Sequence, residues 1–225
     1  MIVFNDVSKK YSANVVALHE INLTISDGEF VFLVGSSGAG KTTMLRLVFG
    51  DLIPTKGSVF VDDWEVNKLK SNLIPLLRRK VGFVFQDFKL LSDRTVYENI
   101  AVALEILGRT KKEMDKRINE VLEIVSLVGK ANYFPRQMSW GEQQRVAIGR
   151  AIAGEAKILL ADEPTGNLDP KTSWEILKII DKINKDGTSV IMATHNVDIV
   201  DSMKKRVIEI YNGRIVRDEK KSKYS

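Results

Sequence analysis

The N-terminal part of the chain alternates between apolar and polar residues, as half-buried strands do. The alternation runs from Ile2 to Tyr11 and again from Val15 to Ile25, and its period of two predicts two antiparallel strands. Phe30 to Val34 is apolar without interruption, which is typical of a strand buried on both faces. A glycine-rich loop follows, and Lys41 to Phe49 then has a helical pattern. The pattern therefore predicts a buried strand, a loop and a helix in direct succession.

The middle of the chain, from Val96 to Gly154, changes to a helical period. Apolar residues recur three or four positions apart, as they do on the buried face of a helix. These residues are Ile100, Leu104, Leu107, Ile118, Val121, Leu122 and Val125. The stretch predicts a helical subdomain inserted between strands.

Strands and helices alternate again after this stretch, which predicts an α/β fold. The expected elements are a strand at Ile158–Ala161, a helix at Lys171–Asn184, a strand at Ser189–Ala193, a short helix from Val197, and a closing hairpin of Val207–Tyr211 and Arg214–Arg217 around Asn212-Gly213. We expect a single domain over residues 1–225. Its core consists of residues 1–86 and 156–225 with an antiparallel β subdomain, and the helical subdomain covers about residues 87–155.

Composition limits the possible classes of protein. The chain has no cysteine, which excludes disulfides, a thiol nucleophile and a cysteine-ligated zinc site. No apolar run approaches the roughly 18 residues of a membrane helix, and the N-terminus lacks the features of a signal peptide, so we expect a cytoplasmic chain. The net charge is +5, and the basic residues are interspersed with acidic ones. We interpret it as a lysine-rich solvated surface and expect no nucleic-acid partner.

The glycine-rich loop has the sequence of a phosphate-binding loop. The pattern G-x-x-x-x-G-K-[ST] is matched in full by Gly35, Ser36, Ser37, Gly38, Ala39, Gly40, Lys41 and Thr42. Glycines let backbone amides approach an anion, and the following helix N-terminus adds a partial positive charge. We expect ATP here, with Lys41 at the β- and γ-phosphates, Thr42 on Mg²⁺ and Thr43 beside it.

A second apolar strand ends in two carboxylates, Asp162 and Glu163. The carboxyl ends of parallel strands meet at one edge of a sheet, beside the phosphate loop. We therefore expect Asp162 to hold Mg²⁺, directly or through water. Glu163 is expected to face the attacking water as general base or water-positioning group. The alternative, a pair of acids that only caps a helix, is disfavoured once the phosphate loop is accepted.

Further motifs follow one another in the order and spacing of a single family. Gln86 follows a strand at Val81–Phe85, Ser139-Trp140-Gly141-Glu142-Gln143-Gln144-Arg145 precedes the acidic strand, Asn167-Leu168-Asp169 follows it, Thr194-His195 ends the next strand, and Tyr11 lies near the N-terminus. These residues resemble the Q-loop, signature, D-loop, switch histidine and adenine-stacking aromatic of the ABC ATPases. The resemblance covers essentially the whole chain and implies a P-loop NTPase core of the ABC type.

The resemblance implies a role for each motif. The catalytic residues are Glu163, His195, Gln86 and Lys41, and the Mg²⁺ residues are Thr42, Gln86 and Asp162. Tyr11 stacks on adenine. Ser139, Gly141 and Asp169 contact ATP held by a second copy, so that a two-fold homodimer encloses two ATP molecules. Ser139-x-x-Glu142 is also the sequence of a capping box, and a capped helix N-terminus is compatible with that role.

One residue departs from the family pattern. Trp140 stands where the family usually has glycine, and Met138 replaces leucine just before the motif. The indole adds bulk where the partner's phosphate approaches, although a helical φ at this position accepts it. The side chain lies outside the dimer interface or packs on the helical subdomain. We expect slower hydrolysis or weaker ATP-driven dimerisation than with glycine, so Trp140→Gly is expected to raise turnover.

Three stretches narrow the resemblance to a cell-division branch of the family. They are Phe85–Leu91, Asp93–Asn99 and Gly213–Asp218. In addition, Ala161–Asp169 resembles a subgroup that works with non-importer membrane proteins. The resemblance implies an integral membrane partner that docks beside the Q-loop. It also implies a peripheral position on the inner face of the cell membrane through that partner.

Alternatives of other classes remain. A transporter subunit for lipoprotein release, drug export or amino-acid uptake differs only in its membrane partner. A DNA-associated ABC ATPase carries a long coiled coil between the phosphate loop and the signature, and this chain has a compact helical segment there instead. A subunit that binds ATP with little turnover would more often have lost one of Glu163 and His195, and both are present.

Overall fold

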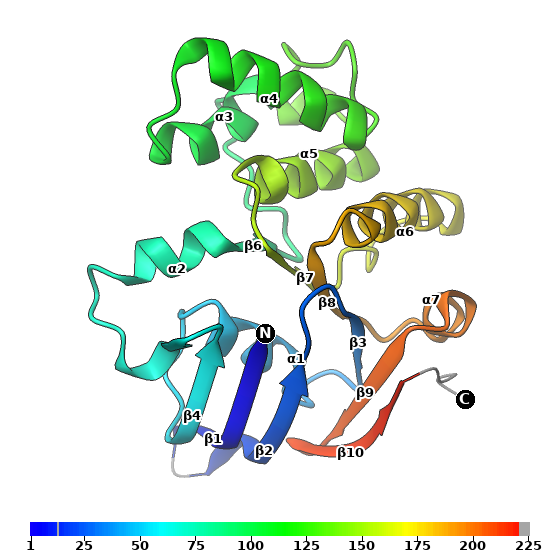
Figure 1. The fold of residues 1–225 in the computed structure, drawn as a ribbon. Helices are drawn as coiled ribbons and strands as arrows, with labels where there is room; N and C mark the ends of the chain where they lie inside the picture. Colours follow the sequence, from blue (N-terminus) through cyan, green and yellow to red (C-terminus); the bar gives the residue numbers. More distant parts are fainter. Residues whose placement is uncertain (13, 221–225) are drawn as a thin grey trace.

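A computed structural model describes residues 1–12 and 14–220, which form two sheets with helices between and around them (Figure 1). The first sheet is antiparallel and has the order β2-β1-β4-β5. Its strands are β1 (Ile2–Ser12), β2 (Val15–Ile25), β4 (Lys56–Val61) and β5 (Trp64–Glu65). This sheet confirms the predicted antiparallel pairing of the first two strands.

The second sheet has the order β10-β9-β3-β8-β7-β6 and is parallel apart from β10, which pairs antiparallel with β9. Its strands are β3 (Phe30–Val34), β6 (Val81–Val84), β7 (Ile158–Asp162), β8 (Ser189–Ala193), β9 (Arg206–Tyr211) and β10 (Arg214–Glu219). The carboxyl ends of β3, β6, β7 and β8 therefore lie at one edge of the sheet. The predicted closing hairpin is confirmed as β9 and β10.

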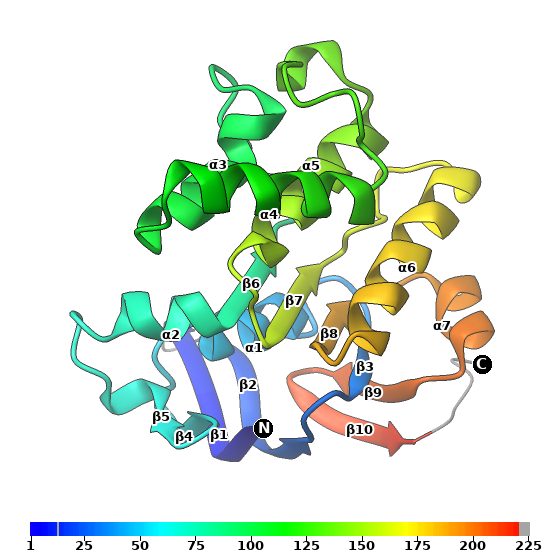
Figure 2. The same cartoon turned by 45° about the horizontal axis from the view of Figure 1, so that its top comes forward.

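The helices lie in three places (Figures 1 and 2). They are α1 (Lys41–Val48), α2 (Ile74–Lys80), α3 (Val96–Ile106), α4 (Lys111–Ile124), α5 (Trp140–Ala153), α6 (Pro170–Lys185) and α7 (Val197–Met203), with short 3-10 turns η1 (Val66–Lys68) and η2 (Pro135–Gln137). Helix α1 packs between the sheets, α6 and α7 cover the outer face of the parallel sheet, and α3 to α5 gather beside the edge strand β6, which both α5 and α2 contact.

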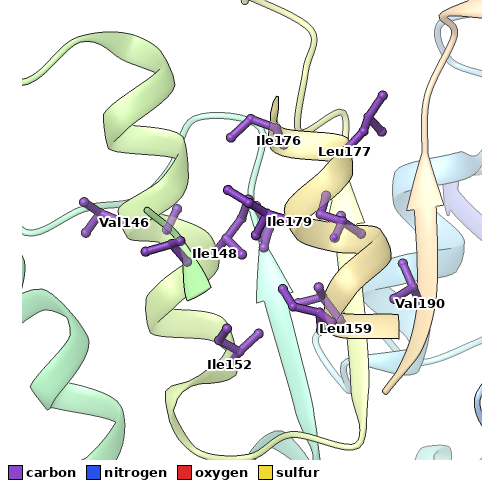
Figure 3. Packing of buried hydrophobic residues seen from close by; sticks show 14 of the residues in the cluster. Val146, Ile148, Ile152, Leu159, Ile176, Leu177, Ile179 and Val190 are labelled. Atoms are coloured by element: carbon purple, nitrogen blue, oxygen red, sulfur yellow. The ribbon is translucent and has the colours of Figure 1, made fainter. Parts of the chain in front are cut away.

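The uninterrupted apolar sequence of β3 supplies both hydrophobic cores. Val31 and Leu33 pack with α1 and the antiparallel sheet, whereas Phe30 and Phe32 belong to the core shared with the helices on the other face. That second core continues from the sheet into the helical segment. Figure 3 shows where α5 and α6 meet, with Ile148 between the two helices. The helical segment is thus anchored to the sheet by continuous apolar packing.

Three helices of the middle stretch begin at capping boxes, in which a hydroxyl and a carboxylate three residues later satisfy each other's backbone amides. The pairs are Thr95 with Glu98, Thr110 with Glu113, and Ser139 with Glu142. The box predicted at Ser139 is therefore confirmed. The prediction of a helical pattern almost throughout the stretch was too continuous, because residues 126–139 are non-helical apart from η2.

Several boundaries differ from the sequence-based expectation. Helix α1 ends at Val48 rather than Phe49, and β6 ends at Val84 rather than Phe85. Strands β4 and β5 and helix α2 were not predicted. Across residues 1–12 and 14–220, no helix combines the length and the apolar character needed to span a membrane.

Candidate nucleotide site

A hollow of about 690 Å³ opens at the carboxyl ends of the parallel strands. It is lined by the phosphate loop, the start of α1, residues of β1 and β2, and residues that follow the ends of β6, β7 and β8. The lining residues are Tyr11, Val15, Val16, Ala17, Ser36, Ser37, Gly38, Gly40, Lys41, Thr42, Thr43, Gln86, Glu163 and His195. The topology of the sheet brings these distant segments together, as expected for a ligand site in an open α/β sheet.

Two glycines fix the path of the phosphate loop between its neighbours. A Cβ on Gly35, whose φ is 143°, would lie 2.2 Å from the carbonyl oxygen of Ile210 in β9. A Cβ on Gly40, whose φ is 117°, would lie 2.7 Å from the carbonyl oxygen of Ala17 in β2. Neither position has room for a side chain, and both conformations favour glycine. The loop is therefore held between β9 and β2 while its centre faces the hollow.

Lys41 is buried and its ammonium group stays within the loop. Nζ donates to the carbonyl oxygens of Gly35 at 2.7 Å and Ser36 at 3.1 Å. It also lies 3.6 Å from Oε1 of Glu163. A buried ammonium needs compensating partners, and two carbonyls and one carboxylate provide them here. The cation therefore lies at the floor of the hollow, where an anionic phosphate can compete for it.

Thr42 and Asp162 present oxygens to each other across the site. Oγ1 of Thr42 donates to Oδ1 of Asp162 at 3.1 Å. Burial raises the pKa of the Asp162 carboxyl above its ordinary value, and the hydrogen bond from Thr42 opposes this rise. One hydroxyl and one carboxylate fit Mg²⁺, which usually keeps several waters and substrate phosphates as its other ligands. The described part of the chain has no cluster of three acidic or histidine side chains for an all-protein metal cage.

Glu163 lies between two functional side chains. Its backbone is left-handed, with φ at 49°, and its amide donates to the carbonyl oxygen of Ala193. Oε2 lies 2.6 Å from Nδ1 of His195, and Oε1 faces Lys41. Because a carboxylate accepts, Nδ1 of His195 carries the proton of this contact. The unusual backbone conformation directs the carboxylate into the hollow, and strain of this kind concentrates at functional sites.

Gln86 and Tyr11 mark two other sides of the hollow. Gln86 is exposed and, within the described residues, its side chain forms no hydrogen bond. Tyr11 is half exposed, and its hydroxyl lies 3.2 Å from Oγ1 of Thr43. The ring thus stands over the start of α1 with an exposed face available for stacking. The neighbouring Val16 and Ala17 also line the hollow, and nothing in the strand's alternation marked them.

Replacing Tyr11 by leucine is expected to raise the KM for ATP by about two- to tenfold, the effect of losing one aromatic stacking partner, with little change in kcat. Steady-state phosphate release against ATP concentration measures this. Tyr11→Phe is the matched control, because it keeps the ring and removes only the contact with Thr43. An equal rise in both variants would show that the hydroxyl, rather than the stacking face, is what ATP binding needs.

The structure places three of the expected nucleotide residues outside this hollow. Ser139 and Asp169 are the N-caps of α5 and α6, and Gly141 is buried in the first turn of α5. None of the three lines the hollow of its own chain. They therefore depend on a second chain if they are to reach ATP, as the resemblance implied.

Gly141 has a packing role that the motif did not reveal. A Cβ on this residue would lie 2.3 Å from Cγ2 of Thr172 in α6. Thr172 in turn donates through both its amide and its hydroxyl to the Asp169 carboxylate. The absence of a side chain thus lets the start of α5 touch the start of α6. The signature and the D-loop are joined by this contact.

A family model described as ABC transporter matches residues 18–166, a range that contains the phosphate loop, Gln86, the signature and the acidic strand. The chain belongs to the ABC transporter family. As an ABC ATPase it hydrolyses ATP, and its two sheets and helices form the cassette fold.

The chain is similar over its whole length to ABC ATPases of cell division. It is 51% identical to the cell division ATP-binding protein FtsE of Bacillus subtilis (strain 168), over 100% of this chain and 98% of the relative. It is 41% identical to FtsE of Escherichia coli (strain K12), over 96% and 97% of the two chains. The Bacillus subtilis relative thus matches this ABC ATPase along its full length.

A solved ABC cassette has the same fold. The ATP-binding cassette MJ0796, in a dimeric post-hydrolysis state bound to ADP and Pi, superimposes with a TM-score of 0.90 at 38% identity, over 98% of each chain. The expected fold class, an α/β ABC core with an antiparallel sheet and helices, is confirmed by this similarity together with the two sheets described above.

Proposed function

We propose that the chain is the ATPase subunit of a cell-division complex, FtsE-like, and that it drives an FtsX-like integral membrane partner which controls peptidoglycan hydrolysis. The observation that carries this proposal is the 51% identity to FtsE across the full length of this chain. The ABC ATPase would lie on the cytoplasmic face of the membrane, held there by that partner. The ATPase would use the energy of ATP to move the partner.

Two chains close around two ATP molecules in this proposal. Each phosphate loop holds one ATP, and Ser139, Gly141 and Asp169 of the second chain complete the site. The dimeric cassette with ADP and Pi supports this arrangement by its fold. The N-terminus of α5 suits the task because the first amides of a helix can bind an anion. Two-fold symmetry then gives two equivalent sites.

Within each site the chain's own residues divide the chemistry. Lys41 compensates negative charge on the β- and γ-phosphates. Glu163 orients the attacking water and accepts its proton, and His195 holds the carboxylate through the Nδ1 contact. Thr42, Asp162 and Gln86 would hold Mg²⁺, which neutralises phosphate charge when bound.

The membrane partner would dock in a second hollow, of about 500 Å³, next to the Q-loop. Three aromatic rings form its apolar wall, with Phe83 stacked on Phe85 and Phe49 edge-on to both. Arg79 and Arg150 line the same hollow and donate to backbone carbonyls, Arg79 to that of Ile106 and Arg150 to those of Phe88 and Lys89. Within the described residues neither forms an ion pair. An apolar pocket lined by guanidinium groups that no carboxylate neutralises within the described residues fits a partner segment that inserts apolar side chains and presents carboxylates.

Reversing one charge at this hollow tests the proposal. The chain is co-expressed with the FtsX-like protein, and the complex is purified in detergent through a tag on the membrane protein. Arg79→Glu is expected to weaken recovery of the ATPase by about tenfold, because a repelled rim charge slows association. Lys112→Glu, at an exposed position of α4, is the matched control and should leave recovery unchanged.

The proposal fails if the tagged FtsX-like protein retains no ATPase, or if a transporter-type permease captures it instead. Equal losses with Arg79→Glu and Lys112→Glu would keep the pairing and reject the hollow as its site.

A further inference from the structure

The tryptophan in the signature contacts the segment that follows Gln86. Trp140, the first residue of α5, meets Phe88 edge to face, with ring centroids 5.6 Å apart and planes at 77°. The indole is 59% exposed, whereas Phe88 is half-buried against the core that contains α5. An aromatic pair in this geometry attracts beyond its buried area. The signature and the Q-loop are thus in direct side-chain contact within one chain.

A side chain of helix α5 also binds the backbone of the segment that follows Gln86. The guanidinium of Arg150 donates from Nη2 to the carbonyl oxygen of Phe88 at 2.8 Å and from Nη1 to that of Lys89 at 2.7 Å. Phe88 and Lys89 are consecutive left-handed residues, with φ at 59° and 49°. Residues other than glycine disfavour this conformation, so it persists where surrounding contacts enforce it. Trp140 and Arg150 supply two such contacts.

The held segment is joined to a side chain that ATP would attract. Gln86 lies two residues before Phe88 and lines the nucleotide hollow without a hydrogen bond in the described part of the chain. When Gln86 engages the phosphates or their Mg²⁺, the turn behind it is pulled with it. A shift of that turn relative to α5 would disturb the Trp140–Phe88 contact.

We propose that Trp140 is a positioning residue: its contact with Phe88 restrains the Q-loop turn relative to the signature helix, and it must loosen before ATP closes the dimer. The proposal rests on the ATP-driven dimer described under the proposed function. The restraint lowers the fraction of chains that are competent to close, which raises the ATP concentration that closure requires.

Two explanations of Trp140 can be separated because its partner ring lies away from the signature. If the indole acts by its bulk at the dimer interface, only changes at position 140 matter. If it acts through the contact, removing the Phe88 ring has the same effect as removing the indole. Phe88→Leu keeps an apolar side chain against the core and leaves the signature sequence intact.

The first measurement is the ATP concentration for half-maximal dimerisation, followed by light scattering in a Glu163→Gln background. Trp140→Gly and Phe88→Leu are each expected to lower it by about two- to tenfold, the factor that corresponds to one edge-to-face pair. The double variant should gain no more than either single change, because both remove one interaction. Trp140→Phe should stay near the parent value, and Trp174→Phe, at an exposed tryptophan of α6, is the control.

A second measurement tests the Trp140–Phe88 contact without depending on dimerisation. Trp64→Phe with Trp174→Phe leaves Trp140 as the sole tryptophan of the chain's three. At protein concentrations too low for dimers, Mg-ATP is expected to shift its emission, and Phe88→Leu should abolish the shift. A shift without dimers at any concentration would support the restraint and reject the proposed dimer.

The inference is overturned if Mg-ATP leaves the emission of Trp140 unchanged. It is equally overturned if Trp140→Gly eases dimerisation while Phe88→Leu does not, because bulk at the interface then explains the tryptophan. A higher ATP requirement in Phe88→Leu would show that the contact assists closure instead of restraining it.

Discussion

A Glu163→Gln variant is expected to lose ATP turnover by about 10²–10⁴-fold, the usual contribution of a general base, while it keeps its affinity for ATP. The amide preserves the size of the side chain and its reach toward His195, but it accepts no proton from water. Lys41, Thr42 and the loop amides are unchanged, so binding should persist. Phosphate release and equilibrium ATP binding measure the two properties separately.

The same variant reports on the dimer. With hydrolysis blocked, Mg-ATP should convert a monomer into a dimer that light scattering detects during size-exclusion chromatography. Glu123→Gln is the matched control, since it makes the same chemical change at an exposed position of α4. Turnover above one-tenth of the parent value would mean that another group activates water. A variant that binds ATP but stays monomeric would contradict the role of Ser139 and Gly141 in a second chain's site.

Gly141→Ala is expected to lower the free energy of unfolding by about 1–3 kcal/mol, the usual cost of overpacking a buried contact. The new Cβ would lie 2.3 Å from Cγ2 of Thr172, so α5 and α6 must separate. Adding Thr172→Ser removes that methyl group and keeps a hydroxyl for Asp169. The double variant should therefore recover most of the lost stability, measured by denaturant unfolding.

Gly149→Ala is the control for this series, because it lies in the same helix and its Cβ would meet side-chain atoms at longer distances, Cγ1 of Val121 at 3.1 Å and Cδ1 of Ile100 at 3.4 Å. There the better helix propensity of alanine offsets the tighter contact. If Gly141→Ala is as stable as the parent, Thr172 yields easily and the glycine serves only the nucleotide. If the double variant is stable but dimerises poorly with ATP, Gly141 serves both purposes.

The sequence predicted those elements whose apolar pattern follows directly from how their faces are buried. Strand β3 is uninterrupted because both of its faces are covered, and β1 and β2 alternate because they are half-buried. Helix α2 was missed since Leu77 is its sole buried residue in a seven-residue helix, too short for a helical period to emerge. Strand β4 was missed because its buried pattern is confined to Val59 and Val61.

The candidate site likewise has one part that the sequence predicted and one part that it did not. Residues fixed by motif and strand end, such as Lys41, Asp162 and Glu163, lie together in the hollow as expected. What the sequence left open depends on contacts between segments far apart in the chain. The direction of Trp140 depends on the left-handed turn at Phe88, and the need for glycine at position 141 depends on one methyl group of Thr172. No local pattern carries that information.

The placement of β3 between β8 and β9 has a consequence for biosynthesis. The phosphate loop is made early, but the strand that carries it gains both neighbours only after residues 189–211 have been synthesised. Gly35 likewise fits against the carbonyl of Ile210. A nascent chain that still lacks β9 therefore displays the complete nucleotide motif without the scaffold that shapes it. We therefore expect the phosphate loop to take its ATP-binding shape only after β9 has been synthesised.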